Sequence, residues 1–202
     1  MPRILSILGA LGAITGALAQ VEIDARFYNE EGCDNFATGC TDLAENSCCG
    51  VSQGGTVLYD SGDFYNTASG MGVTIKGTFF SRQESQPNND CAIVVCGNID
   101  AGECCNADIT LSGASYNRPT SKRGNPVSRR AATRVAPDSY MWVEKEQSYY
   151  ISMGNETKSA AIEAMRQLRD FTNMASFMKT HADVVKSELI NIGASEGRAR
   201  RL

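Results

Sequence analysis

Histidine is scarce in this chain of 202 residues, which contains a single one, His181. Ser-His-Asp triads and two-histidine ribonuclease sites both require a histidine beside the reacting group. His181 lies in a segment with helical periodicity, remote in sequence from the cysteines, and we expect it on the surface. The sequence therefore predicts a protein without catalytic residues. The alternative of a glycan-active enzyme stays open, because the many acids of the first half could supply a glycosidase carboxylate pair.

Long apolar runs are absent after residue 20. The one such run extends from Ile4 to Ala17, follows Met-Pro-Arg and ends at Ala17-Leu18-Ala19. A short basic start, an apolar centre and small residues at the end are typical of a secretory signal peptide. The run is too short to span a bilayer comfortably. We therefore expect residues 1–19 to be removed, leaving a secreted, extracellular protein without membrane attachment.

Cysteine is abundant and confined to the middle of the chain. The eight cysteines are Cys33, Cys40, Cys48, Cys49, Cys91, Cys96, Cys104 and Cys105. An even number in an exported chain predicts four disulfides. Zinc ribbons need separated C-x-x-C pairs, whereas the pairs here are adjacent and no histidine is near, so no metal site is expected. Adjacent cysteines rarely bridge each other. Each cysteine should therefore have a distant partner, and 105 pairings remain open.

The two groups of cysteines have similar spacing. In each group, seven residues separate the second cysteine from the adjacent pair. A short aromatic segment precedes each group, at residues 25–28 and 77–80, and a strand-like segment follows each, at residues 56–59 and 108–111. Such segments, separated by Gly, Asn and Asp, are typical of β-sandwiches. The sequence predicts a mainly β domain at residues 20–116, built from two Greek-key copies.

Two resemblances support this interpretation. The stretches Ala25–Cys33, Gly39–Leu43 and Ser47–Gly50 resemble small secreted cysteine-rich proteins of filamentous fungi. The repeat also loosely resembles the tandem Greek-key domain of βγ-crystallins, which implies a duplicated β-sandwich. Hydrophobins are excluded, because their cysteine order is C-CC-C-C-CC-C and the order here is C-C-CC-C-C-CC.

The βγ-crystallin resemblance also implies a calcium loop as an alternative. Three stretches are similar to such a loop, namely Glu45–Gly50, Gly102–Asn106 and Asp34–Gly39. The first two lack the hydroxyl residues of the family pattern, and the third lies in the wrong part of the repeat. Calcium needs six to eight oxygens in close array. We therefore expect no cofactor and keep calcium as the alternative.

Charge is unevenly distributed along the chain. Residues 20–116 contain 14 acidic and three basic residues, whereas residues 117–135 contain six basic residues and no acid. In a secreted chain this basic stretch predicts a solvated linker at residues 117–137 rather than a nucleic-acid site. It includes two dibasic pairs, Lys122-Arg123 and Arg129-Arg130, which are candidate sites of proteolytic processing in the secretory pathway.

Residues 138–202 are expected to form a hairpin, amphipathic helices and a disordered basic end. The hairpin is predicted at Tyr140–Lys145 and Ser148–Met153, and it carries the only tryptophan, Trp142. Apolar residues at three- and four-residue steps predict helix from Lys158 to Ile190, with a break near Thr180-His181. Asn155 begins an Asn-Glu-Thr acceptor for N-glycosylation.

These features together favour a secreted, non-enzymatic structural or interaction protein of the effector-like kind. Its partner would be an extracellular protein or glycan. A calcium-binding module, and a carbohydrate-binding or carbohydrate-hydrolysing protein, are the alternatives.

Overall fold

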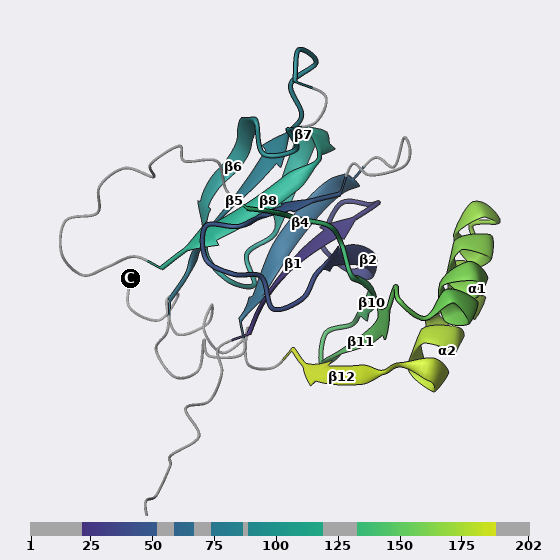
Figure 1. Ribbon diagram of the computed structural model, residues 1–202. Coiled ribbons are helices and arrows are strands. Elements are labelled where there is room, and N and C mark those ends of the chain that lie inside the picture. The colour runs from purple at the N-terminus through teal and green to yellow at the C-terminus, as the bar shows by residue number, and fades with distance from the viewer. Residues whose placement is uncertain (1–21, 52–58, 67–73, 87–88, 119–132, 189–202) are drawn as a thin grey trace, which may run out of the picture.

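The computed structural model of the protein describes residues 22–51, 59–66, 74–86, 89–118 and 133–188 (Figure 1). These residues form two β-sheets and two helices. The large sheet contains β1 (Ile23–Tyr28), β2 (Asn35–Cys40), β4 (Tyr59–Asn66), β7 (Cys105–Leu111), β10 (Ser139–Val143), β11 (Gln147–Ser152) and β12 (Val184–Ser187). The small sheet contains β3 (Cys48–Gly50), β5 (Lys76–Ser81), β6 (Ile93–Ile99), β8 (Gly113–Asn117) and β9 (Arg134–Val135). The expectation of a mainly β fold is confirmed.

The main core lies between the two sheets and is aromatic. The ring of Phe79 from β5 lies 5.4 Å from that of Phe27 on β1 and 4.8 Å from that of Phe64 on β4. Glycines opposite these rings make room for them. A Cβ at Gly62 would overlap Phe79, and a Cβ at Gly77 would overlap Phe64. The sheets can therefore approach closely only because these two strands carry glycine where they face each other.

The strand order is the same in the two sheets, apart from the C-terminal additions. The large sheet has the order β12-β11-β10-β2-β1-β4-β7, and the small sheet has the order β6-β5-β8-β3-β9. We call the strands β1 to β4 the first half of the cysteine-rich region and the strands β5 to β8 its second half. When β1, β2, β3 and β4 are exchanged with β5, β6, β7 and β8 in that order, the run β2-β1-β4-β7 becomes β6-β5-β8-β3. The third strand of each half therefore pairs in the sheet of the other half.

The disulfides follow the same exchange, and all eight cysteines are paired as expected. Two bridges stay within a half and each span nine positions, Cys40–Cys49 and Cys96–Cys105. The other two bridges, Cys33–Cys104 and Cys48–Cys91, join the halves. The exchange that superimposes the strand orders also converts each of these bridges into its counterpart.

The C-terminal residues add strands to both sheets. The predicted hairpin is present as β10 and β11, and β10 pairs with β2 from Ser139 opposite Gly39 to Val143 opposite Asn35. At the edge of the small sheet, β9 pairs with β3 in parallel. The chain after residue 132 is thus part of the same β structure as the cysteine-rich half.

Two helices connect β11 to β12, α1 (Glu156–Gln167) and α2 (Phe171–His181), each capped by a side chain. Asn155 accepts a hydrogen bond from the amide of Lys158, and Asp170 accepts one from the amide of Asn173. Such caps satisfy amides that the first helical turn leaves without partners. Between the helices, Arg169 adopts a left-handed conformation with φ of 53° and reverses the chain.

The prediction of a second helix after His181 is wrong. Val184–Ser187 is strand β12, which pairs with β11, and the helical region breaks at residues 168–170 instead of near Thr180. Adjacent β-branched valines favour extended backbone, and the open edge of β11 supplies their hydrogen-bond partners. The predicted signal peptide, the basic linker pairs and the C-terminal end lie outside the described residues.

The helices cover the part of the large sheet that the small sheet leaves open (Figure 1). Along β2, β10 and β11, every second side chain faces them, including Phe36, Tyr140, Trp142 and Ile151. Ile162 of α1 and Met174 and Met178 of α2 are buried against this face. Among the described residues, neither helix is long or apolar enough to cross a membrane.

Candidate functional site

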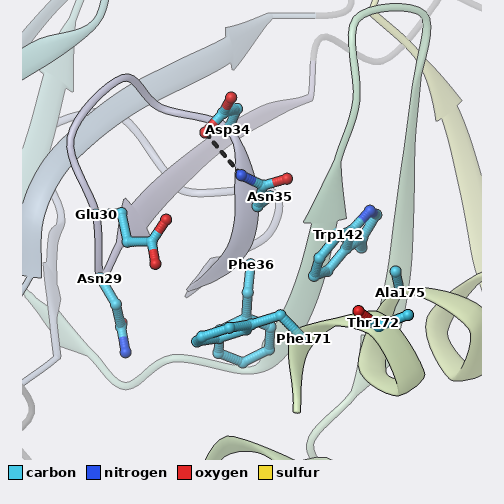
Figure 2. Close-up of a pocket in the computed structure, with 9 residues that line it drawn as sticks. All are labelled: Asn29, Glu30, Asp34, Asn35, Phe36, Trp142, Phe171, Thr172 and Ala175. Atoms are coloured by element: carbon cyan, nitrogen blue, oxygen red, sulfur yellow. Dashed lines mark hydrogen bonds between the residues drawn. The ribbon is translucent and has the colours of Figure 1, made fainter. Parts of the chain in front are cut away.

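A pocket of about 300 Å³ opens where the cysteine-rich half meets the C-terminal residues. It lies between the loop that connects β1 to β2, the strand β10 and the first turn of α2 (Figure 2). Its lining residues are Asn29, Glu30, Asp34, Asn35, Phe36, Trp142, Phe171, Thr172 and Ala175. We call this cavity the aromatic pocket.

The loop on one side of the aromatic pocket is fixed by a disulfide and by its backbone. Cys33 is bonded to Cys104, so the tip of the loop is held against the second half of the cysteine-rich region. Gly32, Cys33 and Asn35 have φ of 99°, 55° and 66°, a left-handed conformation that glycine and asparagine tolerate best. The amide of Gly32 also donates a 2.9 Å hydrogen bond to Asn106 Oδ1. The polar residues of the loop are therefore presented on a constrained backbone.

The floor of the aromatic pocket consists of ordered rings. Phe36 stacks on Tyr140 with ring centroids 6.0 Å apart, on the sheet face beneath the helices. The indole Nε1 of Trp142 donates a 3.1 Å hydrogen bond to Glu144, whose carboxylate also pairs with Lys179 at 2.5 Å. The hydrogen bond from Lys179 lowers the pKa of Glu144. The indole is thus held by an acid that α2 keeps ionised.

The rim of the aromatic pocket is rich in hydrogen-bond acceptors. Figure 2 shows Glu30 directed toward the space above Phe36, with Asp34 and Asn35 on the same side. Asp34 accepts a 3.0 Å hydrogen bond from the side chain of Asn35. Asn29 Oδ1 is buried without a hydrogen-bond partner. Within the described ranges, neither Glu30 nor Asp34 forms an ion pair, so their charges are available to a ligand.

A second pocket, also about 300 Å³, shares Asp34 with the first and borders a buried ion-pair cluster. We call Arg26, Asp63 and Glu188 the Arg26 cluster; at most 6% of any of these residues is exposed. The guanidinium of Arg26 contacts both oxygens of Asp63, at 2.7 and 2.5 Å, and Oε1 of Glu188 at 2.6 Å. Tyr28 donates a further hydrogen bond to Asp63 at 3.1 Å.

The electrostatics of the Arg26 cluster favour a structural role. Burial acts to lower the pKa of Arg26, but the carboxylates of Asp63 and Glu188 raise it well above its ordinary value. Burial raises the pKa of Asp63, although the nearby guanidinium opposes that effect. Both carboxylates bind the same guanidinium, so neither is free to act as a general acid or base beside a substrate. Because Glu188 follows β12, the cluster fastens that strand to β1 and β4.

The remaining predicted sites are dispersed. Asn155 is exposed at the start of α1, and its cap uses Oδ1, which leaves Nδ2 as the atom that a glycan would modify. His181 ends α2 on the surface, with its ring 4.5 Å from that of Phe177. The dibasic pairs Lys122-Arg123 and Arg129-Arg130 lie outside the described residues.

Two of the three stretches compared with a calcium loop run into strands. Asp34–Gly39 is largely strand β2, where successive side chains point to opposite faces of the sheet. Glu45–Gly50 runs into β3, whose two cysteines are buried in disulfides. In the part of the chain that the structure describes, no group of three or more His, Cys, Asp or Glu side chains could hold a metal ion.

Sequence reasoning missed both the aromatic pocket and the Arg26 cluster. The pocket draws on residues near positions 30, 142 and 171, and only pairing of β10 with β2 brings them together. A weak signal for the cluster does exist. In Ile-Asp-Ala-Arg-Phe-Tyr, Asp24 and Arg26 alternate with apolar residues, a pattern that usually marks a solvent-facing side of a strand. Here the covering residues come from β11 and β12.

The comparisons with known proteins give no precedent for this arrangement. No protein-family model, no curated protein and no solved structure matches the chain.

Proposed function

We propose that the protein is an extracellular, non-enzymatic interaction protein that holds its ligand in the aromatic pocket. The observation that carries this proposal is the pocket itself, which has an aromatic floor and a rim of acceptors. Ligand sites are typically concave, largely apolar and equipped with a few polar groups that fix orientation. A disulfide-anchored loop forms one wall, so the geometry is preorganised, which lowers the cost of binding.

The location outside the cell is supported by the four disulfides and by the predicted signal peptide. Disulfides form and persist mainly in the secretory route and outside the cell. The intact mass of the secreted protein tests this part. We expect the mass of residues 20–202 less eight hydrogens, plus any glycan on Asn155. A mass that includes residues 1–19, or eight free thiols, would contradict it.

A tandem Greek-key arrangement of the βγ-crystallin type is the fold that we propose for residues 20–116. Two independent features support it, the matching strand orders and the disulfides that map onto each other when the halves are exchanged. The third strand of each half completes the opposite sheet, so each half supplies only three neighbouring strands of its own sheet. The proposal predicts that neither half, expressed alone, folds.

Carbohydrate is the second candidate ligand. The half-buried Phe171 at the mouth of the aromatic pocket can pack on the apolar face of a sugar, and the amide and carboxylate groups of the rim can accept hydrogen bonds from its hydroxyls. The same observation thus supports either an extracellular protein or a glycan as the partner.

Trp142 makes the proposal directly testable, because it is the only tryptophan and lines the pocket. The oxidised protein would be titrated with neutral oligosaccharides, acidic peptides and basic peptides while its fluorescence is followed. We expect one class to give a saturable change that Phe171→Ala weakens about ten-fold. Leu168→Ala is the matched control, since Leu168 is 79% exposed and outside the pocket. No saturable change with any class would contradict the proposal.

A further inference from the structure

The polar atoms around the aromatic pocket call for a ligand that donates hydrogen bonds and carries positive charge. Glu30 and Asp34 contribute carboxylates that form no ion pair within the described ranges, and ionised carboxylates only accept hydrogen bonds. Asn29 adds a buried carbonyl oxygen without a partner. A protonated amine has three donors and no acceptor, which makes it the complement of this set.

The apolar part of the pocket points to the same chemistry. The faces of aromatic rings attract cations, with tryptophan the strongest, and the effect grows when water is excluded. Only 3% of Phe36 and 6% of Trp142 is exposed, so these rings form the floor of a socket. A sugar ring stacks best on a broad exposed aromatic face, which these buried rings do not offer. A compact cation on a narrow stem suits the socket better.

The size and surroundings of the pocket agree with such a ligand. A volume of about 300 Å³ lies at the lower end of the range for ligand pockets, which fits one side chain better than a large molecule. The strongly acidic composition of residues 20–116 would attract a basic partner and speed its association. Lys179 of the chain itself is already paired with Glu144, the acid that binds the Trp142 indole.

We propose that the aromatic pocket binds the ammonium group of a lysine side chain presented by an extracellular polypeptide. In this arrangement the carboxylates of Glu30 and Asp34 bind the ammonium group. The four-carbon stem packs against Phe171 and Ala175 at the mouth. The inference rests on the proposed function, because it names the ligand class of the same pocket.

The test uses the full secreted protein and a short oligolysine peptide, with Trp142 fluorescence and calorimetry as the two measurements. Acetylation of every lysine amine in the same peptide removes the charge and keeps the chain. We expect saturable binding of the amine form and binding at least about ten-fold weaker of the acetylated form. Binding of the amine form should also weaken as salt is added, because the carboxylates are on the rim.

Matched variants locate the effect. The double variant Glu30→Gln with Asp34→Asn keeps the shape of the rim and removes both charges, and should weaken peptide binding about ten-fold. Glu31→Gln makes the same kind of change in the same loop outside the pocket lining, and should weaken binding less than about two-fold. Unchanged thermal unfolding of the ligand-free variants would show that they fold.

The outcomes separate this inference from the proposed function. Equal binding of the amine and acetylated peptides, or of N-acetylated sugars at the same pocket, overturns the inference and leaves the pocket as a ligand site. Binding of a glucosamine oligomer without binding of the peptide would overturn the assignment of the ammonium group to lysine. If none of the classes, these probes included, changes Trp142 fluorescence, the proposed function fails as well.

Discussion

The two halves of the described molecule are held by different means. Residues 22–118 contain every cysteine, and all eight form disulfides. Two of these, Cys40–Cys49 and Cys96–Cys105, connect strands of the two sheets. Residues 133–188 contain no cysteine, yet β10 lies in the interior of the large sheet between β2 and β11. Cross-links are therefore not what makes a segment part of this fold, since backbone pairing and burial alone include the C-terminal half.

Two sets of contacts take the place of disulfides in the C-terminal half. Arg26 on β1 binds Glu188, and Asp24, also on β1, accepts a 2.6 Å hydrogen bond from Lys186 of β12. On the opposite face of the sheet, Met174 and Met178 of α2 are fully buried against β2, β10 and β11. The strand β12 is thus fixed by buried charge, and the helices by apolar packing. The aromatic pocket depends on both halves.

The largest effect is expected from removing the two disulfides that join the first and second halves of the cysteine-rich region. Cys33–Cys104 and Cys48–Cys91 span 71 and 43 positions, and each should contribute on the order of 4 kcal/mol by restricting the unfolded chain. Their combined loss is comparable with the whole stability of a domain. A variant with all four of these cysteines changed to serine should therefore fail to fold, as circular dichroism would report.

The matched control removes the two short bridges, Cys40–Cys49 and Cys96–Cys105, which span nine positions each. Each should contribute about 3 kcal/mol or less. If loss of the two short bridges destabilised the protein more than loss of the two long ones, the long bridges would not be the main covalent connection between the first and second halves of the cysteine-rich region.

Arg26→Met should have a smaller but still large effect without touching a disulfide. It leaves the carboxylates of Asp63 and Glu188 buried without their cation, which typically costs about 3–5 kcal/mol. Lys158→Met removes the more exposed pair with Asp183 and should cost about 1 kcal/mol or less. Urea unfolding of both variants measures the difference. Equal midpoints would show that the Arg26 cluster does not hold β12.

The helical contact predicts a smaller, local effect. Met178→Ala empties a fully buried position between α2 and the sheet and should lower the free energy of unfolding by about 3 kcal/mol. Leu168→Ala, at the exposed end of α1, should change it by less than about 0.5 kcal/mol. Thermal unfolding followed by Trp142 fluorescence compares the two, and similar shifts would argue against docked helices.

The smallest effect concerns pH. Hydrogen bonds from lysines lower the pKa of Glu144 and Asp183, so their stabilisation is present above about pH 4 and is lost as the pH falls through their folded-state pKa. These groups are partly exposed, so each loss is a fraction of a kcal/mol.

Asp24 and Asp63 behave in the opposite way. Burial raises the pKa of both carboxyl groups in the folded protein. As the pH falls from this raised folded-state pKa toward the ordinary value of about 4, protonation of these groups therefore stabilises the folded state. Carboxyl titration by NMR should show Asp24 and Asp63 protonating before Glu144 and Asp183. The reverse order would contradict this assignment.

Short-range patterns predicted the parts of the fold that local chemistry determines. The aromatic segments at residues 25–28 and 77–80 are in β1 and β5, and the hairpin around Trp142 is β10 and β11. The even number of cysteines, in a chain expected to be exported, correctly predicted four disulfides. The connectivity of the disulfides could not be predicted. Two of the bridges join the first and second halves of the cysteine-rich region, and they depend on which sheet β3 and β7 join.

Contacts between distant segments could not be predicted from the sequence. Val184–Ser187 continued an apparently helical pattern, and only the open edge of β11 makes it a strand. Arg26 was indistinguishable from a solvent-facing residue until Glu188 was placed beside it. The aromatic pocket was hidden for the same reason, since Phe36 and Trp142 meet only through strand pairing.

Cutting the chain within residues 119–132 tests most directly whether the C-terminal half is an integral part of the fold without covalent attachment. A protease specific for dibasic pairs could cut at Arg129-Arg130. The account predicts one species of unchanged size under native conditions, with unchanged Trp142 emission. On a denaturing gel without reductant, the same sample should separate into two fragments, because no disulfide joins them. Release of the C-terminal fragment under native conditions would contradict the account.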